Sequence, residues 1–265
     1  MVMKRKPFLV ISSFNNTGEH LTKYASDYIL FDQSSDSKWD LANRQLGAIK
    51  TSHVGHDLNN ILDFIVDRYD DLPEKIAFLK GNIIGRHCTK EYLELNINND
   101  FYTHFYHDPN VELSNGINDV PFPGMYLEIN DSWYVGPENH KLFCTFDQLA
   151  DRLFEDYKPG KYLLFSPGAC FLITKDHILR HPKSLYLNLS EIASYKFFPD
   201  EAYMVERVLP MIFMSGYRIR LDIDDLKHEI SKKLQLESHV CQMIVAKPRV
   251  KQRLTNIMKR WPEIQ

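Results

Sequence analysis

The order of strands and helix in the first eighty residues limits the fold more than any other feature of this chain. Three short apolar runs have the length and β-branched content of buried strands, and they span Phe8–Ser13, Tyr28–Phe31 and Ile76–Leu79. Before the third run, Gly55–Tyr69 repeats apolar residues from Leu58 onward at i, i+3, i+4 and i+7, which predicts an amphipathic helix. This order predicts an α/β protein with a mixed, largely parallel sheet flanked by helices.

Polar residues follow each of these strands. In open α/β sheets the carboxyl ends of the strands line the ligand crevice. We therefore expect a binding site among the residues that end the three runs, which are Ser12, Ser13, Asn15, Asp32, Lys80, Gly81 and Asn82. The alternative for the Ser, Asn and Asp residues is ordinary turn chemistry, because their side chains hydrogen-bond the local backbone.

The second half of the chain continues the alternation of strands and helices. Strands are expected at Met125–Ile129, Tyr162–Phe165, Ala169–Thr174 and Tyr217–Leu221. Helices are expected at 146–157, 175–181, 184–194, 200–213 and over most of 224–260. The first of these helices follows a capping box formed by Thr145 and Gln148. We divide the chain into a domain over 1–225 and a basic helical C-terminal extension over 226–265 that packs on the same domain.

Charge and cysteine content restrict the partners and the compartment. The net charge of −3 gives no whole-chain signal for nucleic acid. From Lys227 to Gln265 there are nine Lys or Arg residues and three Glu, which suits a solvated helical face, a peripheral membrane contact or a source of cations for a ligand. The four widely spaced cysteines indicate free thiols in a reducing compartment, and no apolar run has the length of a membrane span. We expect a cytoplasmic protein, at most peripheral to a membrane.

Two groups of motifs carry a family resemblance. Ser52-His-Val-Gly-His-Asp57 precedes the first helix, and Ala77-Phe-Leu-Lys-Gly-Asn82 with Arg86-His87 follows it. The run PGACFLITKDHILRHPKSLY begins at Pro167 and is followed by Glu206-Arg207. Together, over about residues 7–215, they resemble a GT-A-type glycosyltransferase-like family of unknown function found in fungi, bacterial polysaccharide gene clusters and large viruses. The resemblance implies a GT-A-like, Rossmann-like fold and transfer of a sugar from a nucleotide-diphosphate sugar to a hydroxyl of a glycan acceptor.

The chain departs from that family at a position relevant to metal binding. Lys80-Gly81-Asn82 stands where many GT-A enzymes carry an Asp-x-Asp motif for Mn²⁺ or Mg²⁺. Lys and Asn are poor substitutes for two carboxylates around a hard dication, so metal dependence is not favoured. A literal Asp222-Ile-Asp224 follows the last predicted strand, where Asp is a common helix N-cap; a displaced metal site is the alternative.

A second, local resemblance concerns the catalytic base. Phe198-Pro-Asp-Glu201 resembles a Pro-Asp-Glu element of metal-independent GT-A glycosyltransferases, in which the Glu is the base and Arg or Lys replaces the metal. This implies Glu201 as general base, with Glu206 as the other candidate. Five residues apart on one helix, the two carboxylates face different directions. Their structural alternatives are a favourable interaction with the helix dipole for Glu201 and an ion pair with Arg207 for Glu206.

The same resemblances imply roles for further residues. Donor binding falls to Ser12, Ser13, Asn15, Asp32, His53, Gly55, Lys80, Gly81, Asn82 and Arg86, and acceptor binding to Gly168, Ala169 and Trp133. His53 itself stands where the family has Asn. Two other readings stay open: a catalytically inactive GT-A-like module that binds or assembles glycans, and a metal-dependent hydrolase that uses histidines such as His53, His56 and His87.

Overall fold

The computed structural model describes residues 5–52, 55–107, 124–136, 142–143, 145–197 and 199–235. By its internal contacts the chain divides into two units, Met1–Ile223 and Asp224–Gln265. The sheet, its flanking helices and the cavities described below belong to the first unit. In the second unit residues 226–235 are helical, and the rest of the basic C-terminal stretch lies outside the described residues.

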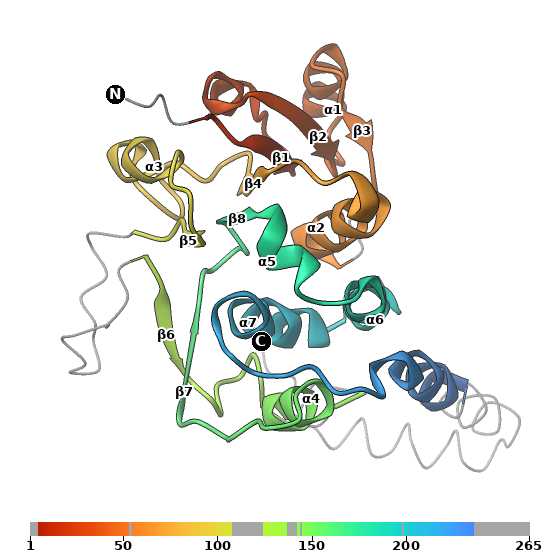
Figure 1. The fold of residues 1–265 in the computed structure, drawn as a ribbon. Coiled ribbons are helices and arrows are strands. Elements are labelled where there is room, and N and C mark those ends of the chain that lie inside the picture. The colour runs from red at the N-terminus through yellow and green to blue at the C-terminus, as the bar shows by residue number, and fades with distance from the viewer. Residues whose placement is uncertain are drawn as a thin grey trace, which may run out of the picture. The chain divides into compact units, whose positions relative to one another are not determined.

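A six-stranded mixed sheet, largely parallel, forms the centre of the first unit (Figure 1). Its strand order is β3-β2-β1-β4-β8-β5. The first four strands are parallel, β8 is antiparallel to β4, and β5 is antiparallel to β8. The strands are β1 (Phe8–Ser13), β2 (Asp27–Asp32), β3 (Ile49–Lys50), β4 (Lys75–Lys80), β5 (Thr103–His104) and β8 (Phe171–Thr174). The predicted α/β class with a mixed, largely parallel sheet is confirmed.

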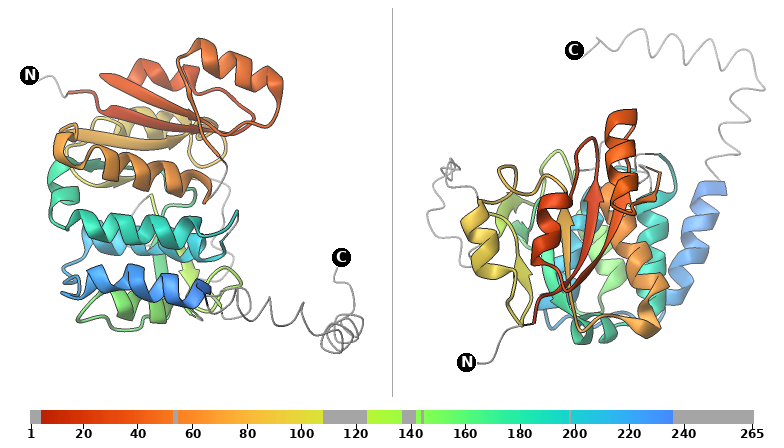
Figure 2. Two further views of the ribbon diagram at one scale, coloured as in Figure 1. Left: turned by 90° about the vertical axis from the view of Figure 1, so that its right-hand side faces the viewer. Right: turned by 90° about the horizontal axis from the view of Figure 1, so that it is seen from above.

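Helices lie on both faces of this sheet (Figure 2). The α-helices are α1 (Ser37–Gln45), α2 (His56–Asp67), α3 (Lys90–Asn96), α4 (Phe146–Leu153), α5 (Lys175–Leu179), α6 (Lys183–Ser194) and α7 (Glu201–Met214). Short 3-10 turns are η1 (Glu19–Tyr24), η2 (Tyr69–Asp71) and η3 (Ile223–Asp225). A separate antiparallel pair joins β6 (Tyr126–Ile129) to β7 (Tyr162–Phe165).

Successive residues of β1 explain why both faces of the sheet are covered. Leu9 shares a buried cluster with Leu21 of η1 and Leu93 of α3. The ring of Phe8 stacks on Phe64 of α2, with centroids 5.6 Å apart. Because successive side chains of a strand point to opposite faces, both faces of β1 lie against apolar groups.

The predicted first helix is confirmed as α2. The apolar stripe that begins at Leu58 is buried along its whole length, and the helix packs against β1 and α6. Each such side chain contributes roughly 1.5–3 kcal/mol by leaving water. The stripe therefore fixes the rotation of α2, and with it the position of Asp57 in its first turn.

The strand register brings the predicted polar residues to one edge of the sheet. Ser13 lies beside Asp32, and Lys80 lies beside Ser12. A main-chain hydrogen bond continues this edge into the loop after β4: the Gly81 amide donates to the carbonyl of Ser12 at 2.8 Å. The carboxyl ends of β1, β2 and β4 therefore lie side by side, as expected for parallel strands.

Several elements differ from the sequence-based expectation. Helices α1 and α3 and strand β3 were not predicted. The expected strand Tyr217–Leu221 forms a single bridge, between Phe154 and Ile219, instead of a continuous ladder. Of the four cysteines, Cys88 and Cys170 are buried free thiols, and the other two lie outside the described residues.

Candidate functional site

A cavity of about 470 Å³ opens at the carboxyl end of β4. It is walled by the end of β4, the loop after it, the first turn of α2, the β6–β7 pair, the turn before β8, and α7. The lining residues are Asp57, Leu58, Lys80, Arg86, His87, Tyr126, Glu128, Tyr134, Phe165, Pro167, Gly168, Ala169, Ala202, Tyr203, Glu206 and Arg207. A second cavity of about 420 Å³ is lined mainly by Tyr, Met and Leu side chains. The ionisable groups gather in the first, which is therefore the candidate site.

Lys80 supplies a cation to this cavity from the last residue of β4. Its Nζ lies 2.7 Å from Oδ2 of Asp57, and both side chains are largely buried. Burial alone would lower the pKa of Lys80, but the charge and hydrogen bond of Asp57, together with Cys170 and Glu206, outweigh it, so the pKa lies above the ordinary value. Lys80 is therefore an ammonium ion at neutral pH.

Glu206 places a carboxylate in the same cavity from the middle of α7. Its Oε1 accepts hydrogen bonds from the amides of Gly168 at 2.6 Å and Ala169 at 3.1 Å, and its Oε2 accepts one from Arg207 Nη1 at 2.7 Å. Burial raises the pKa of Glu206, and Arg207, Lys80 and the two amides offset part of that effect. The group therefore has a greater affinity for a proton than an exposed glutamate.

The turn that holds Glu206 has an unusual backbone. Gly168 has φ 81° and Ala169 has φ 49°, both in the left-handed region. In such turns successive amides point toward one acceptor, which forms a small anion-binding nest. Here Glu206 itself occupies the nest, so the turn before β8 and helix α7 are held in register.

Arg207 connects α7 to the β6–β7 pair. Its Nε and Nη2 donate to the two oxygens of Glu128 at 2.7 and 3.1 Å, and its guanidinium lies 4.0 Å from the ring centroid of Phe165. Arg207 is 4% exposed and Glu128 is 8% exposed. With Glu206 they form a triad of two carboxylates and one guanidinium that links α7 to β6.

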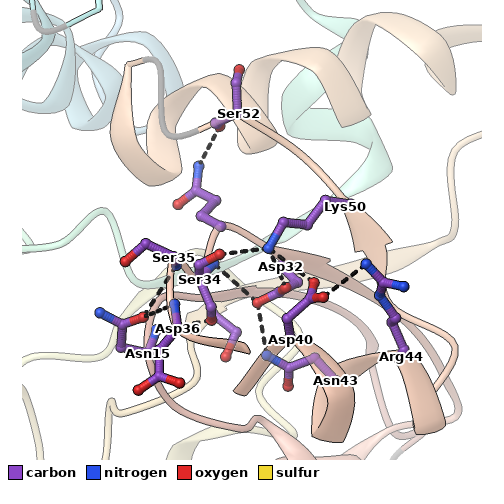
Figure 3. Close-up of polar contacts among 12 residues, drawn as sticks. Asn15, Asp32, Ser34, Ser35, Asp36, Asp40, Asn43, Arg44, Lys50 and Ser52 are labelled. Carbon is purple, nitrogen blue, oxygen red and sulfur yellow. Dashed lines mark hydrogen bonds and ion pairs between the residues drawn. The ribbon is translucent and has the colours of Figure 1, made fainter. Parts of the chain in front are cut away.

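The end of β2 forms a separate polar cluster (Figure 3). Asp32 accepts hydrogen bonds from Asn43 Nδ2 at 2.8 Å, from the Ser34 amide at 3.1 Å and from Lys50 Nζ at 2.9 Å. Burial alone would raise the pKa of Asp32, but the hydrogen bonds from Ser34, Lys50 and Asn43 lower it to about 2. Lys50 also pairs with Asp40 at 3.0 Å. These contacts fix the loop between β2 and α1.

The other predicted donor residues of β1 also contact protein groups. Ser12 Oγ accepts from Asn60 Nδ2 at 3.0 Å, and Ser13 Oγ donates to the carbonyl of Asn16 at 2.6 Å. Asn15, at φ 51°, accepts the Ser35 amide on its Oδ1 at 3.2 Å. Neither these three residues nor Asp32 line either described cavity.

The predicted glycines serve close packing. A Cβ on Gly81 would stand 2.1 Å from Asn16 Oδ1, and one on Gly55 would stand 2.4 Å from the carbonyl oxygen of Ala193. Asn82 is half-buried beside the cavity-lining loop. His53 lies outside the described residues.

Glu201 lies apart from the candidate site. It is fully buried, its Oε1 accepts the amide of Leu142 at 2.6 Å, and its Oε2 accepts the hydroxyl of Tyr195 at 2.6 Å. It is not among the described residues that line the cavity. These contacts tie a distant residue, Leu142, and a nearby one, Tyr195, to the start of α7, which is a structural role.

The predicted acceptor residues reach the cavity in part. Gly168 and Ala169 line it directly. Trp133 is 64% exposed, and its ring packs edge-on against Tyr134, whose side chain does line the cavity. Trp133 therefore lies at the rim.

The described residues offer no ready-made metal site. No group of three or more His, Cys, Asp or Glu side chains in the described ranges is placed to hold a metal ion. Asp222, the first residue of the literal Asp-x-Asp, pairs instead with Arg152 at 3.2 Å and Arg220 at 3.7 Å.

Sequence reasoning missed several lining residues. Asp57 and Glu128 both line the cavity, but neither was predicted as a site residue from the sequence. Glu128 is a lone carboxylate in an otherwise apolar strand, which signals a buried charge with a partner. That partner is 79 residues away, so the sequence could not identify it.

Comparisons with other proteins add no relative. Protein-family models, curated protein sequences and solved structures were compared with this chain, and none matches it. Within the described part of the chain, every helix is too short or too polar to cross a membrane.

Proposed function

We propose that this protein is a glycosyltransferase that moves a sugar from a nucleotide-diphosphate sugar to a hydroxyl of a glycan acceptor. The observation that carries the proposal is that a largely buried carboxylate, Glu206, and a largely buried cation, Lys80, line one cavity at the carboxyl end of β4. The mixed sheet agrees with the GT-A-like fold that the sequence resemblance implies.

Glycosyl transfer needs a base for the acceptor hydroxyl, and Glu206 suits that role. Its raised pKa favours proton uptake, and general bases contribute about 10²–10⁴-fold to rates. A carboxylate has about four acceptor positions, and the described hydrogen bonds to Glu206 use three. The remaining one can receive the acceptor O–H.

In the proposed step the acceptor oxygen attacks the anomeric carbon while its proton passes to Glu206. The bond from the anomeric carbon to the diphosphate oxygen breaks, and the nucleoside diphosphate leaves with the electron pair. Lys80 and Arg86 offset the developing negative charge, since cations placed where charge develops stabilise the transition state.

The residues present do not fit Mn²⁺ or Mg²⁺. A hard dication needs several free oxygen ligands. In this cavity Asp57 forms an ion pair with Lys80, and Glu128 and Glu206 both form ion pairs with Arg207. We therefore assign the neutralising role to side chains and no step to a metal.

The acceptor side is formed by aromatic rings. Tyr134 and Tyr203 line the cavity with their centroids 5.0 Å apart, and Trp133 extends this surface outward. Such rings combine a large apolar area with a polar edge, which suits the apolar face of a pyranose. The position of these rings supports a carbohydrate acceptor.

The test is transfer from a panel of UDP-, GDP-, CDP- and TDP-sugars by the full chain, with and without EDTA. We expect one donor to be turned over, with EDTA leaving the rate unchanged. Glu206→Gln should lower the turnover about 10²–10⁴-fold. Glu201→Gln is the matched control on the same helix, and its folded fraction should keep the wild-type rate. Failure of the folded protein to bind or hydrolyse any donor would count against the proposal.

One observation favours a second candidate, an inactive glycan-binding module. All three carboxylates of the cavity already accept hydrogen bonds or ion pairs from protein groups. Under this reading Glu206→Gln leaves every measured rate at background, whereas Trp133→Ala weakens oligosaccharide binding.

A further inference from the structure

His87 is a buried side chain with an unsatisfied nitrogen in the wall of the candidate site. It is 8% exposed, and its Nε2 has no hydrogen-bond partner. The backbone holds the residue firmly: its amide donates to the carbonyl of Ile83 at 2.9 Å, and its carbonyl accepts the amide of His107 at 2.8 Å. A buried polar atom without a partner is costly, so a site that keeps one suggests a missing ligand.

Gly168 keeps the space in front of this nitrogen open. A Cβ on residue 168 would stand 2.9 Å from His87 Nε2 and 2.9 Å from Lys80 Cε. The imidazole nitrogen and the lysine side chain therefore border the same point, which any larger residue would fill. The space belongs to the cavity, because all three residues line it.

Arg86 adds a second positive charge beside this space. Its side chain lines the cavity and is exposed, and no carboxylate of the described residues lies within ion-pair distance of it. Lys80, by contrast, is paired with Asp57. A guanidinium fork is well matched to the oxygens of a phosphoryl group.

The imidazole contributes a hydrogen bond and no charge. Burial, followed by the charges of Lys80 and Arg86, lowers the pKa of His87 to about 4, and the charge of Asp57 offsets part of this effect. At neutral pH the ring is therefore neutral, and one of its two nitrogens carries a proton. The tautomer protonated at Nε2 donates into the cavity.

We infer that His87, Lys80 and Arg86 form a subsite for a phosphoryl group, in which His87 Nε2–H donates to a phosphate oxygen. The subsite itself requires only a phosphoryl-bearing ligand. Its assignment to the diphosphate of a sugar donor rests on the proposed function.

The test uses inorganic pyrophosphate and the full chain, by isothermal titration calorimetry in EDTA. A hydrogen bond to a charged group typically changes affinity by about 10- to 100-fold. We expect His87→Asn to weaken pyrophosphate binding by about this factor. Gln is longer and can place its amide near the position of Nε2. The pyrophosphate affinity of His87→Gln should therefore stay within about threefold of wild type, a smaller change than the loss of one hydrogen bond causes.

His104→Asn is the matched control. His104 is 5% exposed and also has a buried nitrogen without a partner, but it does not line the candidate cavity. This variant should bind pyrophosphate as wild type does. Equal affinity of wild type and His87→Asn, or no pyrophosphate binding by folded wild type, would overturn the subsite. Malonate binding as tightly as pyrophosphate would overturn its phosphoryl specificity.

A second readout does not depend on the stability of the Asn variant. Heteronuclear NMR of the imidazole groups identifies the His87 signal by its loss in His87→Gln. That signal should move on addition of pyrophosphate to the wild type, and an unmoved signal at saturation contradicts the inference. If pyrophosphate binds through His87 but no sugar donor is turned over, the subsite stands and the proposed function fails. If transfer occurs and His87→Asn leaves donor affinity unchanged, the subsite fails alone.

Discussion

Replacing Arg207 by methionine tests whether the buried charge triad holds α7 against the β6–β7 pair. The variant keeps an apolar side chain beside Phe165 but leaves Glu128 and Glu206 without their guanidinium. Breaking a buried ion pair by removing one partner costs about 3–5 kcal/mol. For a chain of this size that corresponds to a fall in Tm of roughly 10 °C.

The loss should depend on pH with a definite sign. A carboxyl whose pKa is raised on folding makes stability fall as pH rises through its folded pKa, because the ionised form is disfavoured inside the protein. The pKa of Glu206 is already raised, and removing Arg207 takes away a group that lowers it. Arg207→Met should therefore lose more stability at pH 8 than at pH 5, where Glu206 can more readily take up a proton.

Urea unfolding at both pH values measures this loss. Arg152→Met is the control, because Arg152 pairs with Asp222, whose side chain is 53% exposed, and such pairs contribute about 0–1 kcal/mol. Our reasoning is refuted if the two variants unfold at the same urea concentration at both pH values.

Two further predictions concern the sheet edge. The pKa of Asp32 is lowered to about 2, so its stabilising effect is present at pH values above the ordinary Asp pKa and is lost as the pH falls toward 2. Asp32→Asn should therefore destabilise the protein at pH 7 and differ little from wild type near pH 2, as measured by the midpoints of urea unfolding. Gly81→Ala should lower the free energy of unfolding by about 1–3 kcal/mol, because a Cβ there meets Asn16 Oδ1. The control is Gly216→Ala, which has open space around it and should change the free energy of unfolding by less than about 1 kcal/mol. Thermal unfolding measures both variants.

Strands β1 and β4 of the main sheet could be predicted because they are buried on both faces. Strand β1 begins with the apolar run Phe8–Ile11, and α2 shows a complete apolar stripe. Helix α1 could not be predicted in the same way, because its sequence is mostly polar and its Leu41 is 62% exposed. Strand β3 has two residues, and both are exposed, so it leaves no pattern.

The candidate site could be predicted where its residues follow local rules. Lys80 ends a strand at the expected edge, and Glu206 was one of two candidate carboxylates. The sequence could not separate Glu206 from Glu201, because their difference depends on partners far along the chain. The amide that donates a hydrogen bond to Glu201 belongs to a residue 59 positions away in the sequence. The two amides that donate to Glu206 belong to residues 38 and 37 positions away.

The most direct test of the account is the pH dependence of a single turnover with the donor that the panel identifies. The wild-type rate should rise with pH through an inflection above the ordinary glutamate pKa, because Glu206 must be ionised to accept the proton. Glu206→Gln should lose that inflection and about 10²–10⁴-fold of the rate while binding the donor normally. A Glu206→Gln protein that transfers sugar at the wild-type rate with the same pH profile would contradict the account.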